Sequence, residues 1–257
     1  MEEINKRMTI IAPEDSIKRS KSMKISANIY SAAYFAMMKS NKKELKMTDS
    51  EQFDVFFKAL LIYMVQMFFC FCCWWYGNVK IQLFNNVCLQ LALIFATLLL
   101  HLGCLPGTKS GMYMMKYALC HPEKFSHPEV AFFLGVMQIS AMWIAETINV
   151  MKATQRKTAQ ELITSYIGFK SIIDIPTIYL GSINNLAIKG KIGSVTATKA
   201  RKQSNRGIDE TFTGIWLCNA FYVVCKFFFN TFYYYFFTFS VIFVPLAKVL
   251  IKKEMSE

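Results

Sequence analysis

The chain has 257 residues, of which 54% are hydrophobic, 15% aromatic and 18% charged, and its formal net charge is +12. An ordinary soluble domain has about 45–50% apolar and about 25% charged residues, so this composition argues against a soluble globular protein and indicates a small multi-pass membrane protein. The Lys and Arg residues cluster in tails and loops, as in membrane proteins, so we predict no nucleic-acid partner. Most of the eight cysteines lie in apolar runs, which argues against a secreted disulfide framework.

Residues 1–54 form a basic segment, which we expect to be cytoplasmic. Ten Lys and Arg residues are spread over Lys6–Lys46. Inside this segment, Met23–Met38 has apolar residues at helical spacing and predicts an amphipathic helix. Such a helix with flanking cations either lies on an anionic membrane surface or packs on the rest of the protein.

The rest of the chain, residues 55–247, predicts an all-α transmembrane bundle. The first span, Val55–Tyr76, follows a capping-box pattern at Thr48 and Glu51. The second span, Leu83–Leu105, comes after a tight turn and is predicted to stop at Pro106-Gly107. The short connection predicts that these two spans pair in antiparallel fashion.

Two further stretches are long and apolar enough to span, and a third is doubtful. The third span, Val130–Met151, follows a predicted loop over Thr108–Pro128, and the fourth is the aromatic-rich Ile215–Ala247. The stretch Glu161–Ile183 contains charges and a proline, so it is either a fifth span or a re-entrant or interfacial helix. Five crossings with the N-terminus inside place most Lys and Arg residues inside. Residues 248–257 form a charged tail.

Three motifs in the second half resemble a set of uncharacterised multi-pass membrane proteins abundant in ciliates. The motifs are Glu146-Thr-Ile-Asn149, the stretch from Glu161 to Gly168, and the stretch from Ile172 to Tyr179. In that set, an acidic–Asn pair precedes an amphipathic stretch and a last aromatic span. The match covers roughly Ile139–Pro245, with Gly168 where alanine is usual and Pro176 in place of the second acid. The resemblance implies the architecture and no activity.

Four charges lie well inside predicted membrane segments, away from their first turn, and are candidate functional residues: Glu146, Lys170, Asp174 and Lys226. Charges inside a membrane mark ion or proton pathways, or they pair with one another. Lys170 and Asp174 are spaced i,i+4 and can pair on one helical face. Glu146 and Lys226 can meet across the bundle. We therefore expect structural pairing, with a transport path as the alternative.

The three histidines of the chain lie within 27 residues, near two cysteines. Imidazole and thiolate are zinc ligands, so a zinc site formed by these residues is a hypothesis, although the spacing matches no named zinc motif. Ordinary loop histidines are the alternative, and we predict no cofactor. The residues are His101, Cys104, Cys120, His121 and His127.

The aromatic C-terminal span predicts a contact surface. Tyrosine hydroxyls in a membrane need a partner, which is either the bundle itself or a neighbouring subunit. The residues expected to make this contact are Phe221, Tyr222, Tyr233, Tyr234 and Tyr235.

Phosphate-binding loops and nucleophile motifs are absent from the sequence, so we expect no enzyme activity. We expect a subunit that associates with itself or with other membrane proteins, and as an alternative an ion channel or transporter using Glu146, Lys170 and Asp174.

Overall fold

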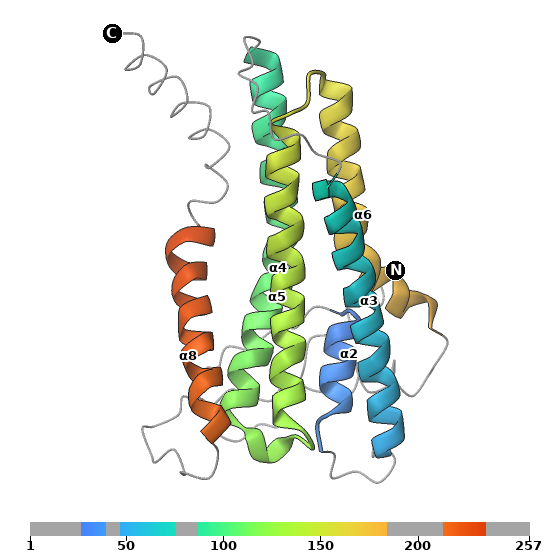
Figure 1. Ribbon diagram of the computed structural model, residues 1–257, viewed down its shortest axis with the longest axis vertical. Helices are drawn as coiled ribbons and strands as arrows, with labels where there is room; N and C mark the ends of the chain where they lie inside the picture. The colour runs from blue at the N-terminus through green and yellow to red at the C-terminus, as the bar shows by residue number, and fades with distance from the viewer. Residues whose placement is uncertain (1–26, 40–46, 76–86, 184–212, 235–257) are drawn as a thin grey trace, which may run out of the picture.

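The computed structural model describes residues 27–39, 47–75, 87–183 and 213–234, and their regular elements are all helical (Figure 1). The elements are α2 (Ile29–Ala36), α3 (Asp49–Trp75), α4 (Val87–Cys120), the 3₁₀ turn η2 (Pro122–Lys124), α5 (Pro128–Ala153), α6 (Ala159–Ser182), α8 (Thr213–Phe228) and the π-helix η3 (Phe229–Tyr233). Three helices are long and apolar enough to cross a membrane: α3, the Cys88–Cys120 part of α4, and α5. The predicted all-α fold is confirmed for the described residues, and the three apolar helices are consistent with the predicted membrane architecture.

That the chain crosses the membrane four or five times stays a prediction. The stretch predicted as a doubtful span forms one helix, α6, which is not among the three apolar ones. The aromatic stretch begins as α8 and η3, but its remainder lies outside the described residues, as do most of the basic segment 1–54, the predicted turn near residue 80 and the tail 248–257.

The capping box predicted at the start of the first span is confirmed. The backbone N–H of Thr48 donates to Glu51 Oε2 at 2.8 Å, and the N–H of Glu51 donates to Thr48 Oγ1 at 3.3 Å. This reciprocal capping box satisfies two N–H groups that the first turn of a helix leaves free. As a result α3 begins at Asp49, six residues before the apolar run.

The predicted stop at Pro106-Gly107 is wrong, because α4 continues through Pro106 to Cys120. A proline inside a membrane helix is tolerated where neighbouring side chains bind the loosened backbone. Here the Gln138 side chain of α5 donates to the Gly107 carbonyl at 2.9 Å. The Thr108 hydroxyl donates to the Cys104 carbonyl at 3.1 Å. Most of the predicted loop after Pro106 is therefore helix.

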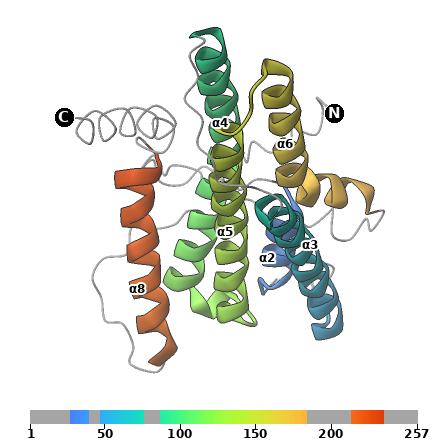
Figure 2. The same ribbon diagram turned by 45° about the horizontal axis from the view of Figure 1, so that its top comes forward.

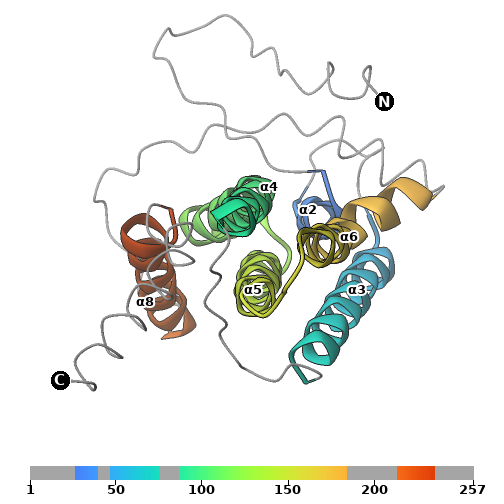
Figure 3. The ribbon, with the colours of Figure 1, turned by 90° about the horizontal axis from the view of Figure 1, so that it is seen from above.

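The central helix is α5, which packs on α2, α3, α4 and α6 (Figures 1 and 3). Its main partner is α4, whereas α3 packs on α2, α5 and α6 and hardly contacts α4 within the described residues. The predicted antiparallel pairing of the first two spans is therefore wrong. Small residues bring α4 and α5 together, because a Cβ atom added at Gly135 would lie 2.9 Å from the Gly111 carbonyl oxygen. Such contact between backbones favours association in a membrane, where dispersion and packing replace the hydrophobic effect.

The short helix α2 is buried in the bundle beside α3 (Figure 2). Apart from Phe35, all of its residues are buried. Asn28 and Ser31 cap its first turn reciprocally, and the Tyr34 hydroxyl donates to the Met114 carbonyl at 3.1 Å. Burial raises the pKa of the Tyr34 phenol, which keeps this donor protonated. Of the two interpretations of the predicted amphipathic helix, the structure supports packing on the bundle.

One hydrogen-bonded chain joins α2, α3 and α6. The Tyr30 hydroxyl donates to Gln66 Oε1 at 2.5 Å, and Gln66 Nε2 donates to the Ile172 carbonyl at 2.8 Å. Ile172 stands four residues before Pro176, which has no N–H to offer that carbonyl. The Gln66 side chain therefore supplies the hydrogen bond that Pro176 removes from α6.

Gln66→Leu is expected to lower the free energy of unfolding by about 1–3 kcal/mol, because it leaves a buried carbonyl and a buried phenol without partners. Pro176→Ala restores an N–H at the right position, so the double variant Gln66→Leu/Pro176→Ala is expected to recover part of this loss. Unfolding in detergent, followed with a thiol-reactive dye on buried cysteines, measures both variants. Additive effects of the two substitutions would contradict this role of Gln66.

Candidate functional site

A buried polar cluster lies halfway along the bundle, around the carboxylate of Glu146 on α5. His101 Nδ1 from α4 lies 2.6 Å from Glu146 Oε1. The Tyr233 hydroxyl from η3 donates to Glu146 Oε2. His101, Glu146 and Tyr233 are 3%, 2% and 1% exposed, so water does not solvate the carboxylate. Both carboxylate oxygens thus have protein partners.

Each side chain of this cluster is positioned by a helix and by aromatic packing. The close crossing of α4 and α5 brings His101 to Glu146, and the wide turn of η3 directs Tyr233 inward. The Tyr233 ring lies 5.0 Å from that of His101 and 5.5 Å from that of Trp143, measured between centroids. Phe228 packs on Trp143 at 5.0 Å. These rings surround the polar atoms with apolar surface.

The geometry fits an ionised Glu146 that accepts two hydrogen bonds. A carboxylate is only an acceptor, so it is satisfied when His101 carries its proton on Nδ1 and Tyr233 donates its hydroxyl proton. Hydrogen bonds to an ionised group are stronger than those between neutral groups, so the cluster stabilises the contacts among α4, α5 and η3. The same chain of groups is also chemically able to pass a proton.

Glu146 is predicted correctly as a buried intramembrane charge, but its predicted partner Lys226 is wrong. Lys226 is exposed on α8 and does not contact this carboxylate. A signal for the right partner is present, because His101 is the one histidine inside a predicted span. A buried acid needs a buried partner, and a histidine in a predicted span is a candidate for that role.

The predicted pair on α6 is present in the structure. Lys170 Nζ lies 2.5 Å from Asp174 Oδ1, and the two side chains are 37% and 39% exposed. The aliphatic part of Lys170 lies over Gly103 of α4, where an added Cβ atom would be 3.9 Å from Lys170 Cδ. Among the predicted intramembrane charges, Glu146, Lys170 and Asp174 all have partners within the chain.

The zinc hypothesis is not supported by the positions of its residues. His101 and Cys104 lie in the middle of α4, whereas Cys120 and His121 lie at its end. Cys120 stands 16 residues after Cys104, which is about 24 Å along the helix axis. His121 instead packs on Tyr117, with ring centroids 4.7 Å apart. Within the described residues, no three His, Cys, Asp or Glu side chains could hold a metal ion. The continuation of α4 through Pro106 separates the two halves of the cluster, and His127 lies beyond it, before α5.

No protein-family model, curated protein or solved structure matches this chain. The function is therefore inferred from the chain's own residues.

The predicted aromatic contact residues divide into inner and outer ones. Tyr233 faces the bundle interior, where its hydroxyl binds Glu146. Phe221 is 45% exposed and touches Phe132 of α5, and Tyr222 is half-buried. Tyr234 is 39% exposed, with Lys109 Nζ 5.0 Å from its ring centroid. Tyr235 lies outside the described residues.

Proposed function

We propose that this chain is a non-enzymatic integral membrane protein that acts as an assembly subunit of a membrane complex. The observation that supports this best is a polar stripe on the exposed surface of the C-terminal helical segment. Asn219, Lys226 and Asn230 are exposed and are spaced at i, i+7 and i+11, which places them on one flank of the helix. We call these three residues the α8 polar stripe.

Lys226 is the residue of the α8 polar stripe that most needs a partner. Within the described residues it forms no ion pair. A lysine at the centre of a membrane helix costs about 2.5–3.5 kcal/mol on insertion scales, unless it pairs or reaches water. Intramembrane charges accordingly pair in most proteins, which favours a carboxylate on a second membrane helix opposite Lys226.

The rest of the exposed α8 surface is apolar. Trp216 is 76% exposed, Phe227 is 70% exposed and Val224 is 64% exposed. In a membrane such a surface faces lipid or another helix, while polar side chains hold helices together by hydrogen bonds. An apolar surface that carries Lys226 and two asparagines is suited to a partner helix with complementary polar groups.

The alternative function is ion or proton transport through the buried cluster at Glu146. The chain of hydrogen bonds from Tyr233 through Glu146 to His101 favours it, since acid and histidine chains relay protons in pumps and transporters. The engagement of both Glu146 oxygens argues for a structural role instead. Proton flux into liposomes that contain the protein distinguishes the two, because a relay loses its flux in Glu146→Gln.

Lys226→Leu is expected to release the partner, because it removes the charge that pairs across the interface. The native mass of the particle extracted in mild detergent should fall toward that of the single chain. Lys226→Arg keeps the charge and is expected to retain the partner. Lys58→Leu is the matched control, since Lys58 is paired with Asp54 on α3 at 2.5 Å. An unchanged particle in Lys226→Leu would contradict the interface.

A further inference from the structure

A basic pocket of about 420 Å³ lies at the end of the bundle where α3 and α5 finish. Its lining residues come from α3, from the end of α5 and the turn after it, and from α6: Cys72, Cys73, Lys152, Gln155, Arg156 and Phe169. No carboxylate of the described residues is among them. The pocket therefore combines two cations with no acidic side chain opposite.

Arg156 in particular lacks an acceptor. Its Nε atom is buried and forms no hydrogen bond in the described part of the chain. Neither Arg156 nor Lys152 takes part in any ion pair among the described residues. A buried charged donor is unfavourable without an acceptor, and guanidinium groups bind phosphate and carboxylate oxygens in a planar fork. The pocket has the chemistry of a site for a phosphate group.

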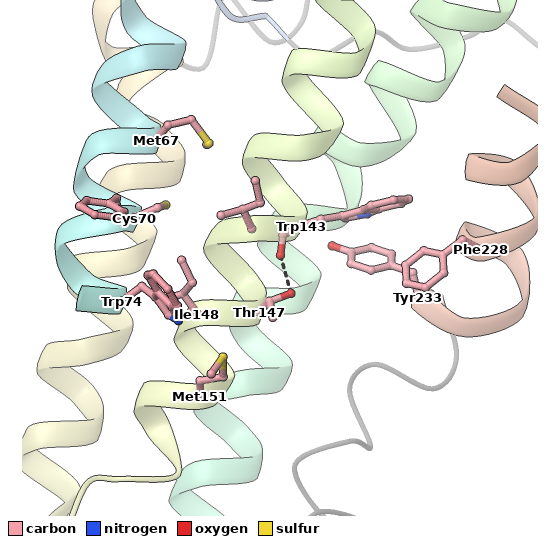
Figure 4. A pocket seen from close by; sticks show the side chains of 11 residues that line it. Met67, Cys70, Trp74, Trp143, Thr147, Ile148, Met151, Phe228 and Tyr233 are labelled. Carbon is pink, nitrogen blue, oxygen red and sulfur yellow. Dashed lines mark hydrogen bonds between the residues drawn. The ribbon is translucent and has the colours of Figure 1, made fainter. Parts of the chain in front are cut away.

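An apolar cleft of about 490 Å³ lies between α3 and α5, and Phe228 of α8 and Tyr233 of η3 also line it (Figure 4). Met67, Cys70 and Trp74 of α3 line one side of it, and Ile148 and Met151 of α5 line the other. Trp74 follows Cys73 directly in the chain, and Lys152 follows Met151 directly, so the cleft and the basic pocket are neighbours between α3 and α5. Nearly all of the cleft lining is apolar.

The basic pocket lies at a level typical of lipid headgroups. Trp74 and Trp75, which end α3, are 50% and 67% exposed. Exposed tryptophans at the end of a membrane helix mark the interface between the hydrocarbon and the headgroups. Cys73 of the pocket stands next to them, so the two cations lie near headgroup depth and the cleft extends toward the hydrocarbon.

We propose that this crevice binds one anionic phospholipid, with its phosphate on Lys152 and Arg156 and an acyl chain in the apolar cleft. Basic pockets between membrane helices bind anionic headgroups, and here the adjoining cleft supplies the place for the chain. Free phosphate would occupy only the pocket. Neither lining includes a residue of the α8 polar stripe, so the two proposals rest on different side chains.

Native mass spectrometry of the full chain, with phosphatidylglycerol or phosphatidylcholine of the same acyl chains added, tests the site. The wild type is expected to retain phosphatidylglycerol about tenfold more tightly than phosphatidylcholine, on the scale of two basic contacts. Lys152→Gln/Arg156→Gln should abolish this preference. Lys157→Gln should keep it, because Lys157 is exposed and outside the pocket lining.

A second variant keeps the test decisive if the double substitution does not fold. Thr147 is exposed at the rim of the cleft, so Thr147→Trp should fill the cleft and lower phosphatidylglycerol binding about tenfold with both cations in place. Inorganic phosphate in excess should not displace the lipid. Equal retention of both lipids by the wild type, full binding by Thr147→Trp, or displacement by phosphate would each overturn the assignment.

Discussion

Gly135→Leu is expected to prevent the native packing of α4 on α5. At this position even a Cβ atom would lie 2.7 Å from Met115 Cγ and 2.9 Å from the Gly111 carbonyl oxygen. The backbone of Gly111 cannot move aside as a side chain can, so the two helices must separate. Overpacking typically lowers the free energy of unfolding by about 1–3 kcal/mol. Because the clash here is with backbone, we expect a loss at the upper end of this range or beyond. The measurement is the yield of monodisperse protein in detergent and its unfolding temperature.

Gly168→Ala is the matched control for this prediction. Gly168 is also in a helix, but a Cβ atom added there meets nothing within 4 Å. The substitution replaces a poor helix former by a good one, so it should be neutral or stabilise α6 by up to about 1 kcal/mol. Equal losses in Gly135→Leu and Gly168→Ala would show that the close crossing of α4 and α5 is not what the fold depends on.

Glu146→Ala is expected to detach the C-terminal helical segment from the bundle. The substitution removes the acceptor of two buried groups, His101 and Tyr233, and leaves a cavity between them. Breaking a buried charged pair in this way costs about 3–5 kcal/mol in soluble proteins, and membrane hydrogen bonds are weaker, so we expect about 2–4 kcal/mol. Hydrogen exchange should rise most over residues 213–234, which this cluster holds to the bundle together with aromatic contacts and the packing of Cys218, Tyr222 and Cys225 on the core.

Two milder variants separate the hydrogen bonds from the packing. Tyr233→Phe keeps the ring between His101 and Trp143 but removes one donor, so it should cost about 1–2 kcal/mol. Tyr234→Phe is its neighbour control and keeps the ring near Lys109, so exchange over η3 should stay at the wild-type level. If Glu146→Ala accelerates exchange equally in α3 and in α8, the cluster does not fasten the C-terminal segment specifically.

Local signals predicted several features of this fold. The bounds of α5 differ from the predicted span by two residues at each end, because an apolar run between polar flanks defines them. The capping box at Thr48 and the pair Lys170–Asp174 involve residues three or four apart, so their spacing alone indicates them.

The missed features depend on side chains from distant helices. Pro106 predicts a helix end on its own, but α4 continues through it, and Gln138 and Thr108 donate to backbone carbonyls on either side of the proline. The choice between the two interpretations of the N-terminal helix also needed the structure, because the hydrogen bond that ties α2 to α3 joins Tyr30 to Gln66, 36 residues away. His101 was not assigned to Glu146 because no spacing rule relates residues 45 apart in different helices.

The most direct test of the proposed function is the native mass and composition of the wild-type particle extracted in mild detergent. The proposal predicts a particle heavier than the 29.6 kDa chain, containing further copies or other membrane polypeptides, one of which carries a carboxylate that cross-links to Lys226. A homogeneous particle with the mass of one chain would contradict an assembly role and would direct attention to Glu146, His101 and Tyr233 as a transport path.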